Sequence, residues 1–142
     1  INEVIYNANI TLKDGQEISY PKDIEDVELF MDEKILELIL SNLLGNAIKY
    51  SPENTSIQFM VNFHDDLIIF KIKDQGRGIP KKDQKHIFER YFRAENALLD
   101  QGTGIGLNIA KTHLENLGGT IQFESEENIG TTFTIEVPMD KS

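Results

Sequence analysis

The chain has 142 residues and a formal net charge of −10, from 14 basic and 24 acidic side chains, which argues against a broad electrostatic surface for nucleic acid or for an anionic membrane. It contains no cysteine, so disulfides, thiolate metal sites and thiol chemistry are excluded. The length and a hydrophobic content of 39% predict a single soluble domain with one core. No apolar run approaches the roughly 18 to 20 residues of a membrane span. Because the chain does not begin with Met, we expect it to be a piece of a longer protein.

The first twenty residues are ambiguous and are compatible with a short helix at Asn2 to Asn7 followed by a strand around Asn9 to Lys13. Asp26 to Phe30 alternates like a strand, and Asp32 is a candidate N-cap for the helix after it. That helix is predicted from about Glu33 to Tyr50, because Ser51-Pro52 ends it. Its apolar face is formed by Leu36, Ile39, Leu40, Leu43, Leu44 and Ala47.

A hairpin is predicted next, from two strand-like runs at Ser56 to Phe63 and Leu67 to Lys73. Asp74 to Pro80 must then be a loop, because it contains two glycines and a proline in seven residues. A short helix is expected from about Lys82 to Phe88. Before the Asp74 to Pro80 loop, the sequence therefore predicts one long helix and one antiparallel strand pair.

A longer helix is predicted from about Ile105 to Leu117, closed by Gly118-Gly119. Thr120 to Ser125 and Thr131 to Val137 form a second hairpin. Helices and antiparallel hairpins thus occur in blocks, without regular strand-helix alternation. This pattern favours an α+β, two-layer sandwich with helices packed on one face of a mixed, mostly antiparallel sheet.

The long helix carries a polar stripe of Asn42, Asn46 and Lys49 at spacing i, i+4, i+7, within about 60° of arc beside the apolar face. A solvent-exposed helix edge would explain one Asn. Two asparagines on one face favour a functional role over that explanation, because Asn is a mediocre helix former. An Asn oxygen suits Mg²⁺, which takes few protein oxygens. Lys49 could then meet a phosphate as a point charge.

Two glycine-rich stretches are candidate ligand loops. In DQGRGIP, Asp74 ends a strand where its carboxylate can accept a hydrogen bond from an amino group, while Gly76 and Gly78 allow positive φ and close backbone approach. A glycine turn capped by Asp would explain this segment as well. In QGTGIGL, three alternating glycines precede a helix, so loop amides and the helix dipole would form an anion site. The spacing is neither the dinucleotide fingerprint nor a P-loop.

Together, four ordered motifs resemble the catalytic and ATP-binding domain of sensor histidine kinases. NLLGNAIKYS resembles the N box, DQGRGIP the G1 box, IFERYFR the F box and QGTGIGL the G2 box. Their order and spacing also match, and the resemblance runs from about Asp26 to Pro138. It implies a Bergerat-type ATP-binding fold, shared with DNA gyrase and mismatch-repair ATPases, with ATP and Mg²⁺ as cofactors.

The resemblance also implies roles for single residues. Asn46 matches the Mg²⁺ ligand, Asp74 the carboxylate that reads the adenine amino group, and Tyr50 the aromatic residue near the base. A threonine supports Asp74 through a water; the choice between Thr131 and Thr132 stays open, and Thr132 is included in the site.

Further positions are implied around the phosphates and the walls of the pocket. Lys49 and Arg93 match family positions that contact phosphates. The glycines and their neighbours would form the floor of the adenine pocket and a lid that closes over the phosphates. These floor and lid positions are Gly76, Gly78, Ile79, Gly102, Thr103, Gly104, Ile105, Gly106 and Leu107.

Asn42 bears on the reaction. In the gyrase-like ATPases a glutamate at this position, one turn before the Mg²⁺ asparagine, activates water, and an amide cannot accept that proton at neutral pH. Phosphoryl transfer to an incoming nucleophile is therefore preferred over hydrolysis. It would depend on positioning and charge stabilisation. The predicted catalytic set is Asn42, Asn46, Lys49 and Arg93.

The acceptor histidine of such kinases lies in a separate dimerisation domain, within a motif H-E-x-x-T-P. None of His64, His86 and His113 stands in such a context, so residues 1–142 should form a kinase fragment that binds ATP but lacks its acceptor. We expect that domain and a downstream response regulator as partners, and a monomeric, cytoplasmic fragment whose parent's membrane attachment stays open. Two alternatives remain: a serine kinase of the anti-sigma type, and a nucleotide-sensing interaction module without catalysis.

Overall fold

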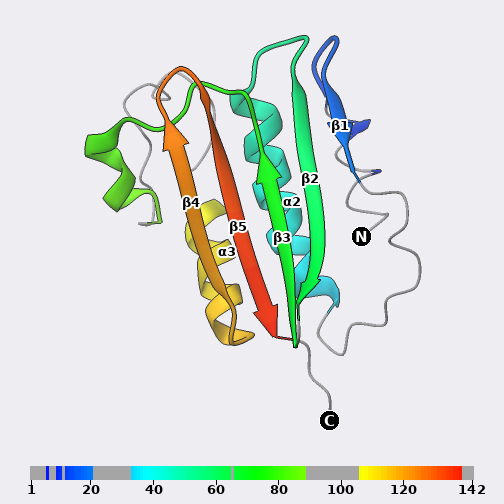
Figure 1. Ribbon diagram of the computed structural model, residues 1–142, viewed down its shortest axis with the longest axis vertical. Helices are drawn as coiled ribbons and strands as arrows, with labels where there is room; N and C mark the ends of the chain where they lie inside the picture. Colours follow the sequence, from blue (N-terminus) through cyan, green and yellow to red (C-terminus); the bar gives the residue numbers. More distant parts are fainter. Residues whose placement is uncertain are drawn as a thin grey trace.

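The computed structural model describes Tyr6, residues 9–10, 12–20, 33–64, 66–88 and 106–138. Within this part of the chain, five strands form one sheet in the order β1-β2-β3-β5-β4. Strands β1 and β2 are parallel and the other neighbours are antiparallel. Helices α2 and α3 lie on the same face of the sheet (Figure 1). The predicted α+β sandwich with a mixed, mostly antiparallel sheet is confirmed.

Helix α2 spans Glu33–Tyr50, the predicted bounds. All six predicted apolar positions are buried, and Ile48 is buried with them. Helix α3 spans Gly106–Asn116. Gly118, with a φ of 77°, ends it, and the Gly119 N–H donates to the Leu114 carbonyl over 2.8 Å. The predicted glycine ending is confirmed, since a left-handed residue lets the chain satisfy the last helical carbonyls.

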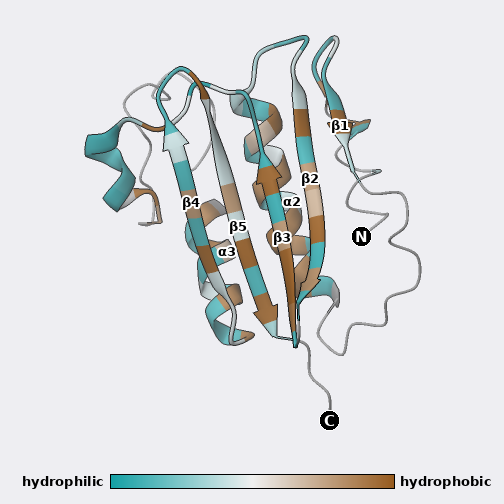
Figure 2. Cartoon of the chain, in the orientation of Figure 1, coloured by the Kyte–Doolittle hydropathy of each residue, from teal (hydrophilic) through white to brown (hydrophobic). Residues whose placement is uncertain are grey.

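The two predicted hairpins are confirmed as β2 (Ser56–His64) with β3 (Leu67–Lys73), and β4 (Thr120–Glu126) with β5 (Gly130–Pro138). Alternate residues of the inner strands point toward the helices, and Figure 2 shows the matching alternation of hydropathy along the strands. Full burial of one such side chain contributes about 1.5 to 3 kcal/mol. The strand residues of this core are Ile57, Phe59, Ile68, Phe70, Ile72, Phe133, Ile135 and Val137.

The N-terminal expectations were partly wrong. Strand β1 is Glu17–Ser19, whereas the predicted strand around Asn9 to Lys13 is contradicted by helical backbone at residues 9–10. A strand of three residues with one buried side chain, Ile18, is too short to show an alternating pattern in the sequence. Strand β1 forms because it pairs in parallel with β2. Of the predicted first helix only Tyr6 is described, and it is helical. The predicted strand at 26–30 and the cap Asp32 lie outside the described residues.

The short helix expected from Lys82 to Phe88 is a 3-10 helix, η1, over Lys81–His86. It follows Pro80, and no side chain caps its first turn. So short a segment gains little from α-helical bonds, because nucleating a helix is unfavourable. Among the helices in the described part of the chain, none has both the length and the apolar character needed to cross a membrane.

Candidate functional site

The C-terminal end of α2, the end of β3 and the turn between β4 and β5 lie at the same end of the sheet (Figure 1). The polar stripe approaches this end along α2. Asn42, Asn46 and Lys49 are each half-buried, while the neighbouring Leu43 and Ala47 are buried. The stripe therefore lies at the margin of the core, as its spacing predicts, where side chains remain open to a ligand.

Asp74 follows directly after β3 and is buried, with 9% exposure. Its Oδ1 atom accepts hydrogen bonds from the Gly76 N–H over 2.9 Å and from the Thr131 N–H over 3.1 Å. Burial raises the pKa of its carboxyl, and the two backbone hydrogen bonds act in the opposite direction. Both bonds from described residues end on Oδ1.

The glycines beside Asp74 are explained by close backbone packing. A Cβ on Gly76 would lie 2.6 Å from the Tyr50 carbonyl oxygen, at the end of α2. Gly78 has a φ of 68°, and a Cβ there would overlap the Glu126 carbonyl of the β4–β5 turn. The loop that follows Asp74 thus packs between the end of α2 and the hairpin of β4 and β5, with its glycines in contact with backbone on both sides. This packing alone explains why both positions are glycine, with no ligand involved. The role of Gly76 and Gly78 in the floor of an adenine pocket therefore stays a prediction.

A set of hydrogen bonds joins the loop to the last hairpin. The Ile79 N–H donates to Ser125 Oγ over 2.8 Å, and Ser125 Oγ lies 2.8 Å from Thr131 Oγ1. The Gln84 amide donates to the carbonyls of Ile79 and Ser125. Sequence reasoning missed Ser125 and Gln84, because their proximity to Ile79 depends on how the hairpin lies against the loop.

The structure distinguishes Thr131 from Thr132. Thr131 is buried and donates its N–H to Asp74. Thr132 is the partner of Lys73 in the ladder between β3 and β5, and it alternates with the core residue Phe133. Side chains of adjacent strand residues point to opposite faces, so Thr132 belongs to the face turned away from the helices. Thr131 thus contacts Asp74 directly through its backbone N–H, and the support through a water stays a prediction.

Tyr50 lies next to two cationic groups. Lys49 Nζ is 5.4 Å from the centre of its ring, and Arg77 Cζ is 5.2 Å from it. Both distances are within the range of cation–π attraction. Sequence reasoning did not single out Arg77, because its approach to Tyr50 brings together residues that are 27 positions apart in the chain. In a chain of net charge −10, Lys49 and Arg77 thus place two cationic groups beside one aromatic ring at this end of the sheet.

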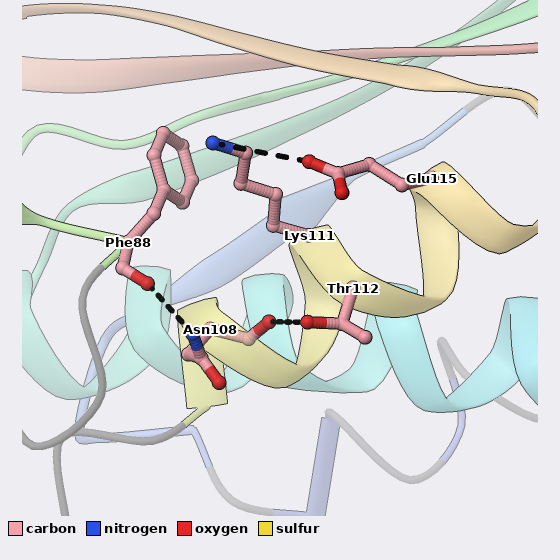
Figure 3. Close-up of polar contacts among 5 residues, drawn as sticks. All are labelled: Phe88, Asn108, Lys111, Thr112 and Glu115. Carbon is pink, nitrogen blue, oxygen red and sulfur yellow. Dashed lines mark hydrogen bonds and ion pairs between the residues drawn. The ribbon is translucent and has the colours of Figure 1, made fainter.

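Residues in the first turns of α3 contact Phe88 (Figure 3). Asn108 Nδ2 donates to the Phe88 carbonyl over 2.9 Å, and Lys111 Nζ lies 5.1 Å from the centre of the Phe88 ring. Lys111 also pairs with Glu115 at 3.9 Å. On its other side, Phe88 meets the Phe123 ring edge-on at 5.9 Å. Phe88 is therefore half-buried against the core.

Several predicted site residues lie outside the described part of the chain: Arg93, Gly102, Thr103, Gly104 and Ile105. Gly106 is the first residue of α3, and Leu107 packs partly buried against the core. Across the described residues, no group of three or more His, Cys, Asp or Glu side chains could hold a metal ion. The prediction of Asn46 as a Mg²⁺ ligand stays a prediction.

The chain is similar in sequence to known proteins. Residues 31–141 match the family model described as histidine kinase-, DNA gyrase B-, and HSP90-like ATPase. The sensor histidine kinase WalK of Bacillus subtilis is 37% identical over 129 residues, and YvrG of the same organism is 42% identical over 125 residues. These matches cover 87% and 86% of this chain but 21% of each kinase.

The fold comparison gives the same result. The structure of the mycobacterial sensor histidine kinase MprB superimposes with a TM-score of 0.79 at 26% identity, covering 97% of this chain and 95% of that one. The matches to sequence and to structure thus agree on the family. The chain belongs to the histidine kinase-, DNA gyrase B- and HSP90-like ATPase family, in which it corresponds to the catalytic and ATP-binding domain of sensor histidine kinases.

Proposed function

We propose that this chain binds Mg·ATP and donates the γ-phosphoryl group to a histidine on a separate dimerisation domain of the same kinase, in two-component signalling. The observation that carries the proposal is the meeting of a buried carboxylate, Asp74, with the half-buried stripe of α2 at one end of the sheet. Asp74 supplies a partner for an amino group, and the stripe supplies partners for phosphate.

Adenine recognition is assigned to Asp74. Its Oδ1 is occupied by two backbone N–H donors, which fixes the plane of the carboxylate and directs Oδ2 to accept from the exocyclic amino group. A hydrogen bond to a charged acceptor is stronger than one between neutral groups, by about a factor of two. Tyr50, with Lys49 and Arg77 near its ring, is the aromatic group proposed to pack near the base.

The residues present fit a Mg²⁺ ion that is held largely by phosphate. Asn46 offers one amide oxygen at the core margin. Mg²⁺ commonly takes one or two protein oxygens and completes its shell with water and phosphate, so the absence of a carboxylate cluster among the described residues is compatible with such a site. When bound, the ion would neutralise charge that develops on the phosphates.

The chain's own contribution to transfer is positioning and charge. Lys49 is proposed to contact a phosphate oxygen, with Arg93 as a second cation. Asn42 cannot act as a base toward water, which favours an incoming side chain as the nucleophile over hydrolysis. The 37% and 42% identity to two sensor histidine kinases supports histidine as that side chain. The parent kinase's dimerisation domain and a response regulator are then the proposed partners, and the cytoplasm, where ATP is available, is the proposed location.

The deciding experiment supplies the chain with Mg·[γ-³²P]ATP and a purified dimerisation domain that carries the H-box histidine. We expect label on that domain, lost when the histidine is replaced by alanine and lost in acid, because phosphohistidine hydrolyses there. Label that survives acid would support the serine kinase. Saturable ATP binding without transfer to any acceptor would support a nucleotide-sensing module.

A further inference from the structure

The C-terminal end of α2 is held by side chains from a turn that precedes β1. Gln16 is buried to 6% exposure, and the two N–H groups on its Nε2 donate to the carbonyls of Ile48, Ser51 and Pro52, which lie 3.0 to 3.2 Å from that nitrogen. Lys13 Nζ donates to the carbonyls of Lys49 and Ser51, both over 2.8 Å. The last carbonyls of a helix have no partner within it, so residues 13–16, called here the 13–16 turn, supply partners from a distant part of the chain.

The turn itself is built to present these donors. The Lys13 N–H donates to Gln16 Oε1 over 2.8 Å, which orients the amide with its nitrogen toward the helix end. The Gln16 N–H donates to the Lys13 carbonyl, and Gly15 has a φ of 74°. The Asp14 carbonyl accepts the Asn54 N–H, which ties the turn to the chain after α2. The ammonium group of Lys13 also lies at the negative end of the helix dipole.

The residues at this helix end are those of the proposed nucleotide site. Lys49 and Tyr50 are the last two residues of α2. The Tyr50 carbonyl packs so closely on Gly76 that no Cβ would fit, and the Gly76 N–H donates to Asp74 Oδ1. A continuous series of contacts therefore leads from Gln16 through the end of α2 to the carboxylate proposed to read adenine.

We propose that Gln16 and Lys13 are positioning residues of the nucleotide site. By holding the last carbonyls of α2, they set where Lys49 and Tyr50 present their side chains and how the Gly76 N–H meets Asp74. They touch neither nucleotide nor acceptor. This inference rests on the proposed function, because it concerns the geometry of that same site, and it adds a segment of the chain outside the four sequence boxes.

The test compares four variants with the unaltered chain. Gln16→Ala removes three donated hydrogen bonds, and Lys13→Met removes two while keeping an apolar stem. Lys13→Arg keeps donors at the same place. Val137→Ala is the stability control, since Val137 is fully buried at the far end of β5, paired with Ile68. Each variant is studied at a temperature at which circular dichroism shows it folded.

Calorimetric titration with Mg·ATP should show weakening by about tenfold for Gln16→Ala and Lys13→Met. Lys13→Arg and Val137→Ala should bind like the unaltered chain, although Val137→Ala unfolds at a lower temperature. If Gln16→Ala does not fold, Lys13→Met carries the comparison. Affinities within about twofold of the unaltered chain, despite lowered stability in both variants, would overturn the proposal.

A second measurement needs no nucleotide. In ¹⁵N–¹H spectra, Gln16→Ala and Lys13→Met should shift the amide resonances of Tyr50 and Gly76, whereas Val137→Ala should leave both in place. If the unaltered chain fails to bind Mg·ATP, the proposed function fails, and the amide shifts still test the contact series. If the amide resonance of Gly76 is unshifted in both variants, the positioning role is refuted independently of any ligand.

Discussion

Asp74→Asn should make the nucleotide-free chain more stable and at the same time unable to hold ATP tightly. Burial raises the pKa of the Asp74 carboxyl, so the ionised group destabilises the folded state at neutral pH. An amide has nearly the same shape and no charge. Its oxygen can still accept from the N–H groups of Gly76 and Thr131, which donate to Asp74 Oδ1 in the structure.

The same two donors determine how the variant meets adenine. Only one orientation of the amide gives both N–H groups an acceptor, and it directs the amide NH₂ group toward the exocyclic amino group of the base. A hydrogen bond to a charged acceptor, of about 1.5 to 3 kcal/mol, is lost, and two donors are left facing each other at a further cost of about 1 to 3 kcal/mol. The dissociation constant should therefore rise by about a hundredfold or more.

Two assays measure the two effects. Urea unfolding of both proteins without nucleotide, at a series of pH values, gives the stability difference. A raised folded-state pKa means that the penalty of the ionised carboxylate is fully present above that pKa and is relieved as the pH falls through it toward the ordinary value of 3.8. The advantage of Asp74→Asn should thus be largest at neutral pH and shrink on acidification. Calorimetry with ATP gives the affinity.

An affinity for ATP within about threefold of the original would refute the assignment of Asp74 to the base. A variant less stable than the original at neutral pH would refute a different step, the claim that burial of the charge outweighs the two backbone hydrogen bonds. Asp66→Asn is a suitable control, because Asp66 is exposed in the turn between β2 and β3 and the same change of charge there should leave the affinity for ATP unaltered.

Three further outcomes are expected. Asn46→Ala should remove the Mg²⁺ dependence of ATP affinity but keep the metal-free affinity, measured by calorimetry with and without Mg²⁺; an unchanged Mg²⁺ effect would exclude Asn46 as the ligand. Gly45→Ala should stabilise the chain by about 0.8 to 1 kcal/mol in urea unfolding, because Gly45 lies within α2 with nothing within 4 Å of an added Cβ; a loss of stability would contradict that open space. Asn108→Ala should lower stability by about 0.5 to 1.5 kcal/mol through loss of its hydrogen bond to Phe88, and no change would show that the bond contributes nothing.

Local spacing was sufficient to predict most of the elements. Helix α2 has the predicted bounds, because an apolar face repeating at helical period is followed at once by Ser51-Pro52. Both hairpins were predicted to within about two residues, since alternation of buried and exposed side chains is a property of each strand alone. The boxes, read in order, indicated the family, and the family model matches residues 31–141.

Contacts between distant segments could not be predicted in this way. Strand β1 has one buried side chain and exists through its parallel pairing with β2. Arg77 stands in a recognised motif, yet its place near Tyr50 follows from how the loop packs on the end of α2. The choice of Thr131 over Thr132 required the ladder between β3 and β5.

The sequence by itself determined the helix that carries the polar stripe, the two hairpins, the loop that begins at Asp74 and the family, because each depends on residues close together in the chain. Only the tertiary structure decided how Asp74 is held, why Gly76 and Gly78 must be glycine, and that Gln16 holds the end of α2. The physical reason is that buried backbone groups must find hydrogen-bond partners, and those partners come from whichever segments the fold brings near.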